Sequence, residues 1–427
     1  FFLINFSYIS ILFASDKNLI FPDKLGVLVE QNLNNKVINK SNLGDSKQPA
    51  TYHIALVTGM TTQGAEDTLA AQEIIKRYGL VEEGGLIHYI TYPDDYIDKP
   101  EEITSLIGAL GDDPLLKVIV VNQALGGTAD GFKKVKEKRS EIICLAGVPH
   151  EQASIIAETS DLVVDGDFIS RGYLLPYVAK QLGAKNIVHI SFDRHMKYDS
   201  ILLRSLIMEK AAKNLDLNFF YETAIDPVIA GEDVAIESIN KNTSLWLQQY
   251  GSQTAFFATN DSHVAPLIQQ LSKQGQGIFL ESDLPTPLVG FASAFNVDLE
   301  SIMGKWNEII NKLDGAIKKL GGENRFVTWA YPLSFSLSTG LVEFGVQIAE
   351  NKVKVSDIQA LLKCLGVFSP LVRWNGTFLT DYYTGKPYRN FFIVFQDSYV
   401  FGRGFIETTK VDIPDEFFSI TLPETSQ

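Results

Sequence analysis

Two stretches decide the fold of this chain: Val164-Asp-Gly-Asp-Phe-Ile-Ser-Arg-Gly172 and Thr254-Ala-Phe-Phe-Ala-Thr-Asn-Asp-Ser262. In each, a run of apolar residues gives way at once to polar ones, the pattern of a buried parallel strand that ends where a helix begins. Both belong to the second of two successive strand–helix series. Ligands of open α/β sheets bind outside the carboxyl ends of the strands. We therefore expect two sheets, each in its own lobe, and a ligand cleft between them.

The rest of the chain repeats this rhythm of short apolar runs and amphipathic segments. We expect strands at 53–57, 86–91, 118–121, 142–145, 162–164, 187–191, 218–221, 255–258, 277–280, 288–290 and 325–329, with helices between most of them. The predicted fold is α/β, with two doubly wound parallel-sheet lobes joined by a multi-crossing hinge. The predicted parts are a leader (1–50), lobe one (51–165 and 295–350), lobe two (166–294), and a C-terminal helix with a β-meander (351–427).

Length and charge narrow the classes of protein. A chain of 427 residues is too long for one ordinary core, so two domains are the natural expectation. Its 37 basic and 51 acidic residues give a net charge of −14, which argues against nucleic acid as a main partner. The two cysteines, Cys144 and Cys364, lie in apolar surroundings and form neither a zinc site nor a disulfide framework.

The first 14 residues are mostly apolar and carry no charge. They are too few to span a bilayer as a helix. Their end at Ala14-Ser15 suits a signal peptidase, so they fit the apolar part of a secretory signal. A packed N-terminal element is the alternative. Export would make the protein periplasmic or cell-surface.

Familiar catalytic motifs are missing. The first turn, Gly59-Met-Thr-Thr-Gln-Gly64, has the glycine spacing of a phosphate loop, but Ala65-Glu66 follows where Lys-Ser/Thr is required. The turn also lacks a dinucleotide G-x-G-x-x-G, and no G-x-S-x-G occurs. These absences disfavour nucleotide hydrolysis, hydride transfer and acyl hydrolysis, and we expect no cofactor.

Polar residues collect where the predicted strands end, and they would suit a polar small molecule bound by many hydrogen bonds. Each could instead only cap the helix that follows. In lobe one the candidates are Thr58, Gln63, Asn122, Gln123 and His150; in lobe two they are Asp167, Arg171, Asp193, Arg194, His195, Asn260, Asp261, Ser282 and Asp283.

Histidines raise two further possibilities. His150, His195 and His263 all follow strands, so a three-histidine metal site is conceivable, but no pair has ligand spacing on a helix and we expect no metal. His195 with Asp193 is compatible with acid/base chemistry, although no nucleophile accompanies them. His53, His88 and His189 lie within strands and are interpreted as core residues.

Taken together, residues 52–350 resemble the type 1 periplasmic solute-binding proteins, a family that includes sugar and nucleoside receptors and the effector domains of lactose-repressor-like regulators. Asp165–Glu222 is similar to the start of that family's second lobe, Thr259-Asn260-Asp261 to its polar strand-end turn, and Val289-Gly290-Phe291 to the strand before the chain returns to lobe one. The resemblance adds Arg204, early in a predicted helix, as a ligand contact.

The resemblance implies ligand binding with hinge closure and no chemical reaction. The crossings would lie near 164–167, 291–297 and 325–335. Partners would be a small polar ligand, such as a sugar or nucleoside, and a membrane permease or a sensor. A ligand-sensing regulator is the alternative. The long leader, the helix near 300–320 and the aromatic-rich tail depart from the family pattern and indicate a divergent bacterial branch.

Overall fold

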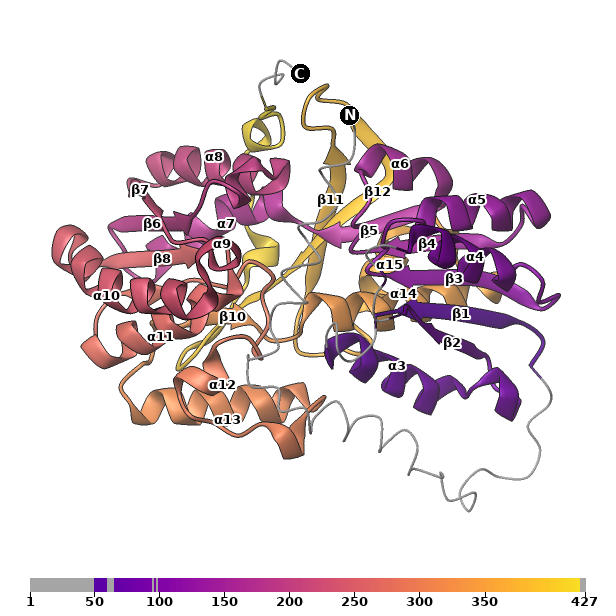
Figure 1. The fold of residues 1–427 in the computed structure, drawn as a ribbon, viewed down its shortest axis with the longest axis horizontal. Helices are drawn as coiled ribbons and strands as arrows, with labels where there is room; N and C mark the ends of the chain where they lie inside the picture. The colour runs from indigo at the N-terminus through magenta and orange to yellow at the C-terminus, as the bar shows by residue number, and fades with distance from the viewer. Residues whose placement is uncertain (1–49, 60–64, 94–95, 97–98, 423–427) are drawn as a thin grey trace. The chain divides into compact units, whose positions relative to one another are not determined.

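The computed structural model describes residues 50–59, 65–93, 96 and 99–422, which divide into two compact units (Figure 1). Unit 1 contains the described residues up to Asp165, together with Ser334–Pro370 and Asn390–Phe392. Unit 2 contains Gly166–Leu333, Leu371–Arg389 and the residues from Ile393 onward.

Unit 1 is built on parallel strands β1 to β5. The strands are β1 (His53–Thr58), β2 (Ile87–Thr91), β3 (Leu116–Asn122), β4 (Ile143–Gly147) and β5 (Leu162–Gly166), adjacent in the order β5-β4-β3-β1-β2. In the centre, Ile54 pairs with Ile87 on one side and Val118 on the other, and all three side chains are fully buried. Burial on both faces explains why these strands read as continuous apolar runs.

Helices cover both faces of this sheet. They are α3 (Ala65–Tyr78), α4 (Pro100–Leu110), α5 (Thr128–Lys138), α6 (Ala153–Thr159), α14 (Leu333–Ala349) and α15 (Ile358–Leu365). Figure 1 shows α4, α5 and α6 on one face, and α3 and α14 on the other. Because the strands are parallel and in this order, the polar residues that follow β1, β3 and β4 leave the sheet at one edge.

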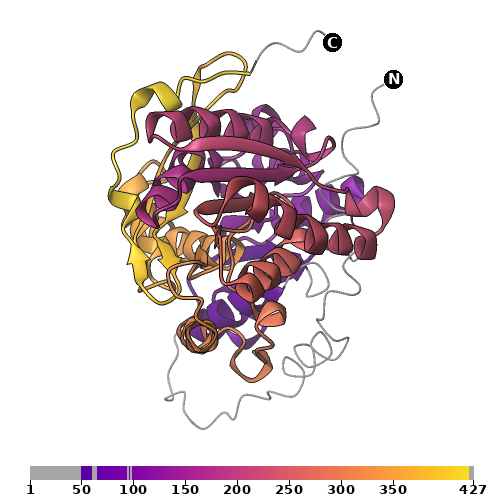
Figure 2. The same cartoon turned by 90° about the vertical axis from the view of Figure 1, so that its left-hand side faces the viewer.

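Unit 2 repeats the design around four parallel strands in the order β7-β6-β8-β9. The strands are β6 (Asn186–Ser191), β7 (Asn218–Thr223), β8 (Thr254–Ala258) and β9 (Ile278–Phe279); the helices are α7 (Phe168–Gln181), α8 (Asp199–Asn214), α9 (Pro227–Ala230), α10 (Glu232–Tyr250), α11 (Asp261–Gln274), α12 (Phe291–Ala294) and α13 (Trp306–Lys319). Figures 1 and 2 show α7 and α8 on one face of the sheet and α10 and α11 on the other.

Close packing of α7 on α8 depends on a glycine. A Cβ atom on Gly172 would lie 2.6 Å from Cγ2 of Ile207, so only glycine lets the two helices approach this closely. Asp167 begins α7 as its N-cap, and its carboxylate accepts a hydrogen bond from the amide of Ser170 at 2.7 Å. This cap sets the start of the helix directly at the end of β5.

The C-terminal region is β-rich, as expected, but its strands pair with strands from earlier in the chain. Its strands are β11 (Trp374–Thr380), β12 (Pro387–Gln396), β13 (Ser398–Val400) and β14 (Gly404–Ile406). β12 neighbours β5 in the seven-stranded sheet, with β11 outside it. β13 pairs antiparallel with both β10 (Val327–Trp329) and β14 in a separate three-stranded sheet. The tail is therefore part of both units.

The predicted α/β class with parallel sheets is confirmed, and two details are corrected. The strand expected at Leu288–Gly290 is wrong: the backbone bends there, and Gly290 has φ of +79°, which ends extended structure. Residues 295–333 were expected in lobe one, but they belong to unit 2, since β10 pairs with β13. The predicted leader, residues 1–50, lies outside the described residues except for Ala50.

Candidate functional site

The carboxyl edge of the unit 2 sheet carries a small hydroxyl–imidazole cluster. Ser191 ends β6, and its Oγ lies 2.7 Å from Oγ1 of Thr259, which follows β8. The same Thr259 hydroxyl lies 3.1 Å from Nδ1 of His195. All three side chains are buried. Burial lowers the pKa of His195 to about 4, so its imidazole is neutral at pH 7.

An ionic network lies beside this cluster. Arg171 of α7 forms an ion pair with Glu281 at 3.3 Å and donates hydrogen bonds to the carbonyls of Ser282 (3.0 Å) and Asp283 (2.6 Å). Arg204 of α8 donates to the carboxylate of Asp283. These ion pairs connect helices α7 and α8 to the segment that follows β9.

Packing holds the two arginines in place. The guanidinium of Arg171 lies over the ring of Trp329 at 5.5 Å, and that of Arg204 lies over Phe257 at 4.9 Å. Burial raises the pKa of Glu281, against the opposing effect of Arg171. A cavity of about 10 Å³ beside Arg171 and Glu281 has room for about one water molecule, so this pair forms packed structure.

A third group of charges lies after β6 and β7. The guanidinium of Arg194 donates two hydrogen bonds, of 2.7 and 2.8 Å, to the carboxylate of Asp226. Hydrogen bonding to Asp226 raises the pKa of Arg194. Asp193 is exposed, so the structure does not bring it to His195 as acid/base chemistry would require. The Nε2 atom of His195 is buried and has no hydrogen-bond partner.

Two further predicted residues of unit 2 each have one polar atom that makes no hydrogen bond. Asn260 is the N-cap of α11 and accepts from the amide of Ser262 at 3.0 Å, while its buried Nδ2 has no partner. Asp167 likewise caps α7 with Oδ1, while its buried Oδ2 has none. Burial raises the pKa of Asp167 to about 6. Asp261 is half-buried in the first turn of α11, and Ser282 donates to the carbonyl of Leu284.

In unit 1 the polar residues at the strand ends converge on a carboxylate that the sequence did not single out. Asp67, in the first turn of α3, is fully buried and accepts hydrogen bonds from Asn122 (2.7 Å), Gln123, Ser334 (2.8 Å) and Ser338 (2.9 Å). Burial raises its pKa, although these four donors act in the opposite direction. The amide donors of Asn122 and Gln123 are thus already used inside the protein.

The other polar atoms among the unit 1 candidates make fewer hydrogen bonds within the protein. The hydroxyl of Thr58 donates to the carbonyl of Gly59 at 2.9 Å. Nδ1 of His150 and Oδ1 of Asn122 are buried without partners. Burial lowers the pKa of His150 to about 4. Gln63 lies outside the described residues.

Sequence reasoning missed Asp67, Glu281 and Asp226. Glu281 directly precedes the predicted Ser282 and Asp283, so counting one residue further at the same strand end would have found it. Asp67 lies one residue after the mismatched Ala65-Glu66 of the first turn, where a helix-surface residue was the simpler interpretation. Asp226 gives no local signal, because only its pairing with Arg194 identifies it.

The three histidines His150, His195 and His263 do not form a metal group. Nε2 of His263 donates a hydrogen bond to the carbonyl of Ile225 (3.0 Å), and Nδ1 of His195 contacts the hydroxyl of Thr259. Within the described ranges, the side chains arranged to hold a metal ion are His53, His88 and Asp113, at the other edge of the unit 1 sheet.

Comparison with known proteins identifies the family. The family model described as "Protein of unknown function (DUF3798)" matches residues 52–327, more than half of the chain. The chain belongs to this family. A second family model matches residues 338–420.

Among relatives, an uncharacterized protein of Treponema pallidum (strain Nichols) is 37% identical over 188 residues, which are 44% of this chain and 85% of that protein. Among solved structures, a putative transcriptional regulator from Clostridium difficile 630 matches with a TM-score of 0.74 at 19% identity, over 83% of this chain and 100% of that chain. A sugar ABC transporter protein from Actinomyces odontolyticus ATCC 17982 matches with a TM-score of 0.48 at 11% identity, over 72% of this chain and 87% of that one. At these identities, the match at 0.74 shows a shared fold.

Proposed function

We propose that this protein binds a small polar molecule without transforming it, as an extracytoplasmic solute receptor that serves transport or sensing. One observation carries the proposal: unit 2 contains buried polar side-chain atoms that have no protein partner. Nε2 of His195 and Nδ2 of Asn260 lie shortly after strands β6 and β8, Oδ2 of Asp167 lies at the start of α7, and Nε of Arg204 lies in α8.

Such atoms are costly in a folded protein. A buried donor or acceptor that lacks a partner costs about 1–3 kcal/mol, and folded proteins keep few of them. The four side chains expose between 0% and 3% of their surface. A ligand that supplied the missing hydrogen bonds would recover this free energy on binding, which is how a polar site becomes both tight and selective.

The kinds of atom indicate the ligand class. Arg204 and Asn260 offer donors, Asp167 offers an acceptor, and neutral His195 can do either, depending on its tautomer. A hydroxyl group can donate and accept at once. This mixture therefore favours a ligand with several hydroxyls, such as a sugar or a nucleoside, over a ligand of high net charge.

The chemistry of the site favours binding over catalysis. His195 has a hydroxyl on one ring nitrogen and no partner on the other, so no carboxylate orients it as a general base. Asp193, the carboxylate considered for that role, is exposed.

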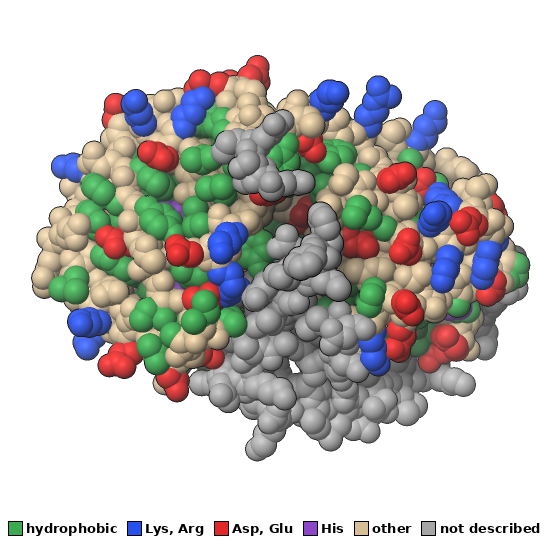
Figure 3. Space-filling model, turned by 45° about the horizontal axis from the view of Figure 1, so that its top comes forward, with side chains coloured by type: hydrophobic (Ala, Val, Ile, Leu, Met, Phe, Trp, Pro, Cys, Tyr) green, Lys and Arg blue, Asp and Glu red, His purple; other side chains and the backbone are tan. Residues whose placement is uncertain are grey.

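A ligand-sensing regulator is the second candidate. The solved structure with a TM-score of 0.74 is named as a putative transcriptional regulator, and the likeness covers all of that chain. The net charge of −14 argues that this chain would not itself contact DNA. On the face seen in Figure 3, basic and acidic side chains are interspersed over the described surface rather than gathered by sign.

Export and a permease partner complete the proposal. The uncharged apolar run of the first 14 residues supports an extracytoplasmic location. In the part of the chain that the structure describes, no helix is both long and apolar enough to cross a membrane.

A thermal-shift panel of sugars, polyols, nucleosides and amino acids tests the proposal, followed by calorimetry on any hit. A ligand at about 100 times its dissociation constant should add about 2.7 kcal/mol of stability. Turnover of the hit, followed by mass spectrometry, must remain undetectable. A hit that is converted into product would show an enzyme instead.

The matched variants are Asn260→Asp and Asn311→Asp. Asn260→Asp keeps the oxygen that caps α11 but replaces the free Nδ2 donor with an acceptor. Asn311 is exposed on α13, so its substitution controls for the added charge. We expect at least about tenfold weaker binding for the first variant, the effect of about 1.4 kcal/mol, and none for the second.

A further inference from the structure

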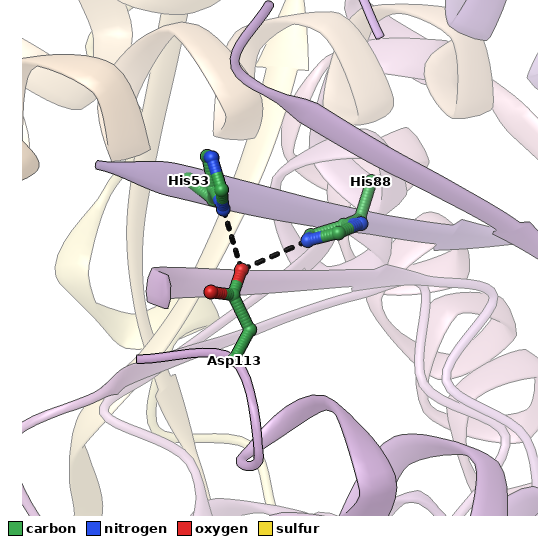
Figure 4. Close-up of side chains that lie close together, drawn as sticks. All are labelled: His53, His88 and Asp113. Atoms are coloured by element: carbon green, nitrogen blue, oxygen red, sulfur yellow. Dashed lines mark hydrogen bonds and ion pairs between the residues drawn. The ribbon is translucent and has the colours of Figure 1, made fainter. Parts of the chain in front are cut away.

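The amino-terminal edge of the unit 1 sheet holds a group of three convergent side chains that the proposed function does not use. His53 is the first residue of β1, His88 lies near the start of β2, and Asp113 lies in the turn before β3. Figure 4 shows both imidazoles directed at the carboxylate. Nδ1 of His53 lies 2.6 Å from Oδ2 of Asp113, and Nε2 of His88 lies 2.8 Å from the same oxygen.

We propose that His53, His88 and Asp113 form a binding site for a divalent transition-metal ion of the zinc class. Their three ligand atoms lie within 4.8 Å of one another. Zinc binds imidazole nitrogen and carboxylate oxygen at about 2.0–2.2 Å, so ligand atoms around a tetrahedral ion lie about 3.3 Å apart. A small outward movement of the carboxylate makes room for the ion.

The donor set selects the metal. Two imidazoles and one carboxylate suit zinc, cobalt and nickel better than magnesium or calcium, which prefer oxygen ligands alone. To bind, each imidazole turns its lone pair to the ion and carries its proton on the other ring nitrogen. The exposed fractions of the three side chains, 12%, 24% and 20%, leave an opening through which water completes the coordination.

Neighbouring groups hold the carboxylate in position. Its other oxygen, Oδ1, accepts a hydrogen bond from the amide of Leu115 at 2.9 Å. The backbone carbonyl of Asp113 accepts a hydrogen bond from Nη1 of Arg139 at 2.5 Å. These contacts fix the orientation of the carboxylate, so that its Oδ2 atom faces both imidazoles.

The place of the group in the fold suggests a structural role. The ion would join β1, β2 and the entry to β3 at one edge of the sheet. β1 has six residues, so His53 is about 17 Å from Thr58 at the other edge, at about 3.3 Å per residue. Metal binding should therefore stabilise unit 1 and leave binding of the polar ligand unchanged.

The test uses the full chain, freed of any histidine tag and treated with a chelator, then titrated with Co²⁺ and with Zn²⁺. We expect one ion per chain, the visible absorption bands of cobalt bound by nitrogen and oxygen, their loss on addition of Zn²⁺, and a rise in melting temperature with Zn²⁺. No saturable binding, or binding without the cobalt bands, would overturn the proposal.

A pair of adjacent aspartates supplies the control. Asp113→Asn and His88→Gln should each weaken Zn²⁺ binding by more than about 100-fold, beyond the loss typical of groups that only support a ligand. Asp112→Asn should bind as the natural chain does, since Asp112 points to Lys138 and is exposed. Circular dichroism checks that each variant folds. Equal affinity in Asp113→Asn and Asp112→Asn would place the ion elsewhere.

Discussion

Acidification from pH 7 to pH 5 should destabilise this protein through buried neutral histidines. Burial lowers the pKa of His189 to about 3, and lowers those of His150, His195 and His263 to about 4, from 6.5. The unfolded chain takes up these protons as the pH falls through 6.5, whereas the folded chain does so only near pH 4 or below. Stability is therefore full above pH 6.5 and is lost as the pH falls through this window.

The magnitude can be worked out for His189, which is fully buried, stacked on Phe257 at 5.6 Å and hydrogen-bonded to Ser205 at 2.9 Å. At pH 5 the unfolded form is about 1.5 pH units below its pKa and the folded form is still neutral. At 1.36 kcal/mol per unit, this residue alone costs about 2 kcal/mol. Asp167 acts in the opposite direction: its pKa of about 6 lets the folded chain take up a proton between pH 7 and pH 5, which raises the stability by about 1 kcal/mol over that range.

The assay is urea unfolding, followed by circular dichroism at pH 7, 6 and 5, for the natural chain and for His189→Gln. The variant should be less stable at pH 7, because it loses the ring stacking. Its further loss between pH 7 and pH 5 should be smaller than that of the natural chain by about 2 kcal/mol. Equal losses in the two proteins would refute the reasoning, because they would show that His189 is not held neutral in the folded state.

Three substitutions test the charge networks and the packing. Arg171→Met should cost about 3–5 kcal/mol in urea unfolding, because it leaves Glu281 buried without its partner; a change under 1 kcal/mol would contradict the pairing. Asp67→Asn should cost about 1–3 kcal/mol in the same assay, because it replaces an acceptor oxygen with an amide donor that faces other donors, and an unchanged midpoint would contradict this. Gly147→Ala should lower stability by about 1–3 kcal/mol, since its Cβ would lie 2.3 Å from Oδ1 of Asn122; no change would mean that the amide moves freely.

The sequence predicted the parallel strands well, because burial on both faces leaves a local mark. Runs such as Ile54–Val57 are apolar at every position, and all four of these residues are fully buried. The cap at Asp167 was also predictable, since an N-cap depends only on its own next three residues. Polar residues at strand ends were found by the same local logic.

Long-range pairing was not predictable. The apolar run before Gly290 looks like a strand, but a positive φ at that glycine turns the chain. Nothing local to β10 reveals that its partner is β13, some 70 residues later. Likewise, His53 and His88 were interpreted as core residues, because the carboxylate that draws them together comes from a separate turn.

Hydrogen exchange with and without a saturating ligand from the panel tests the central claim most directly. We expect ligand-dependent protection in the segments 191–198, 259–264 and 280–284, which follow the unit 2 strands and carry or support the unpartnered atoms. Protection confined to other segments, such as the shallow hollow of about 410 Å³ between α4 and α5, would contradict the proposed site. Failure of every polar ligand in the panel to bind would contradict the account of a solute receptor.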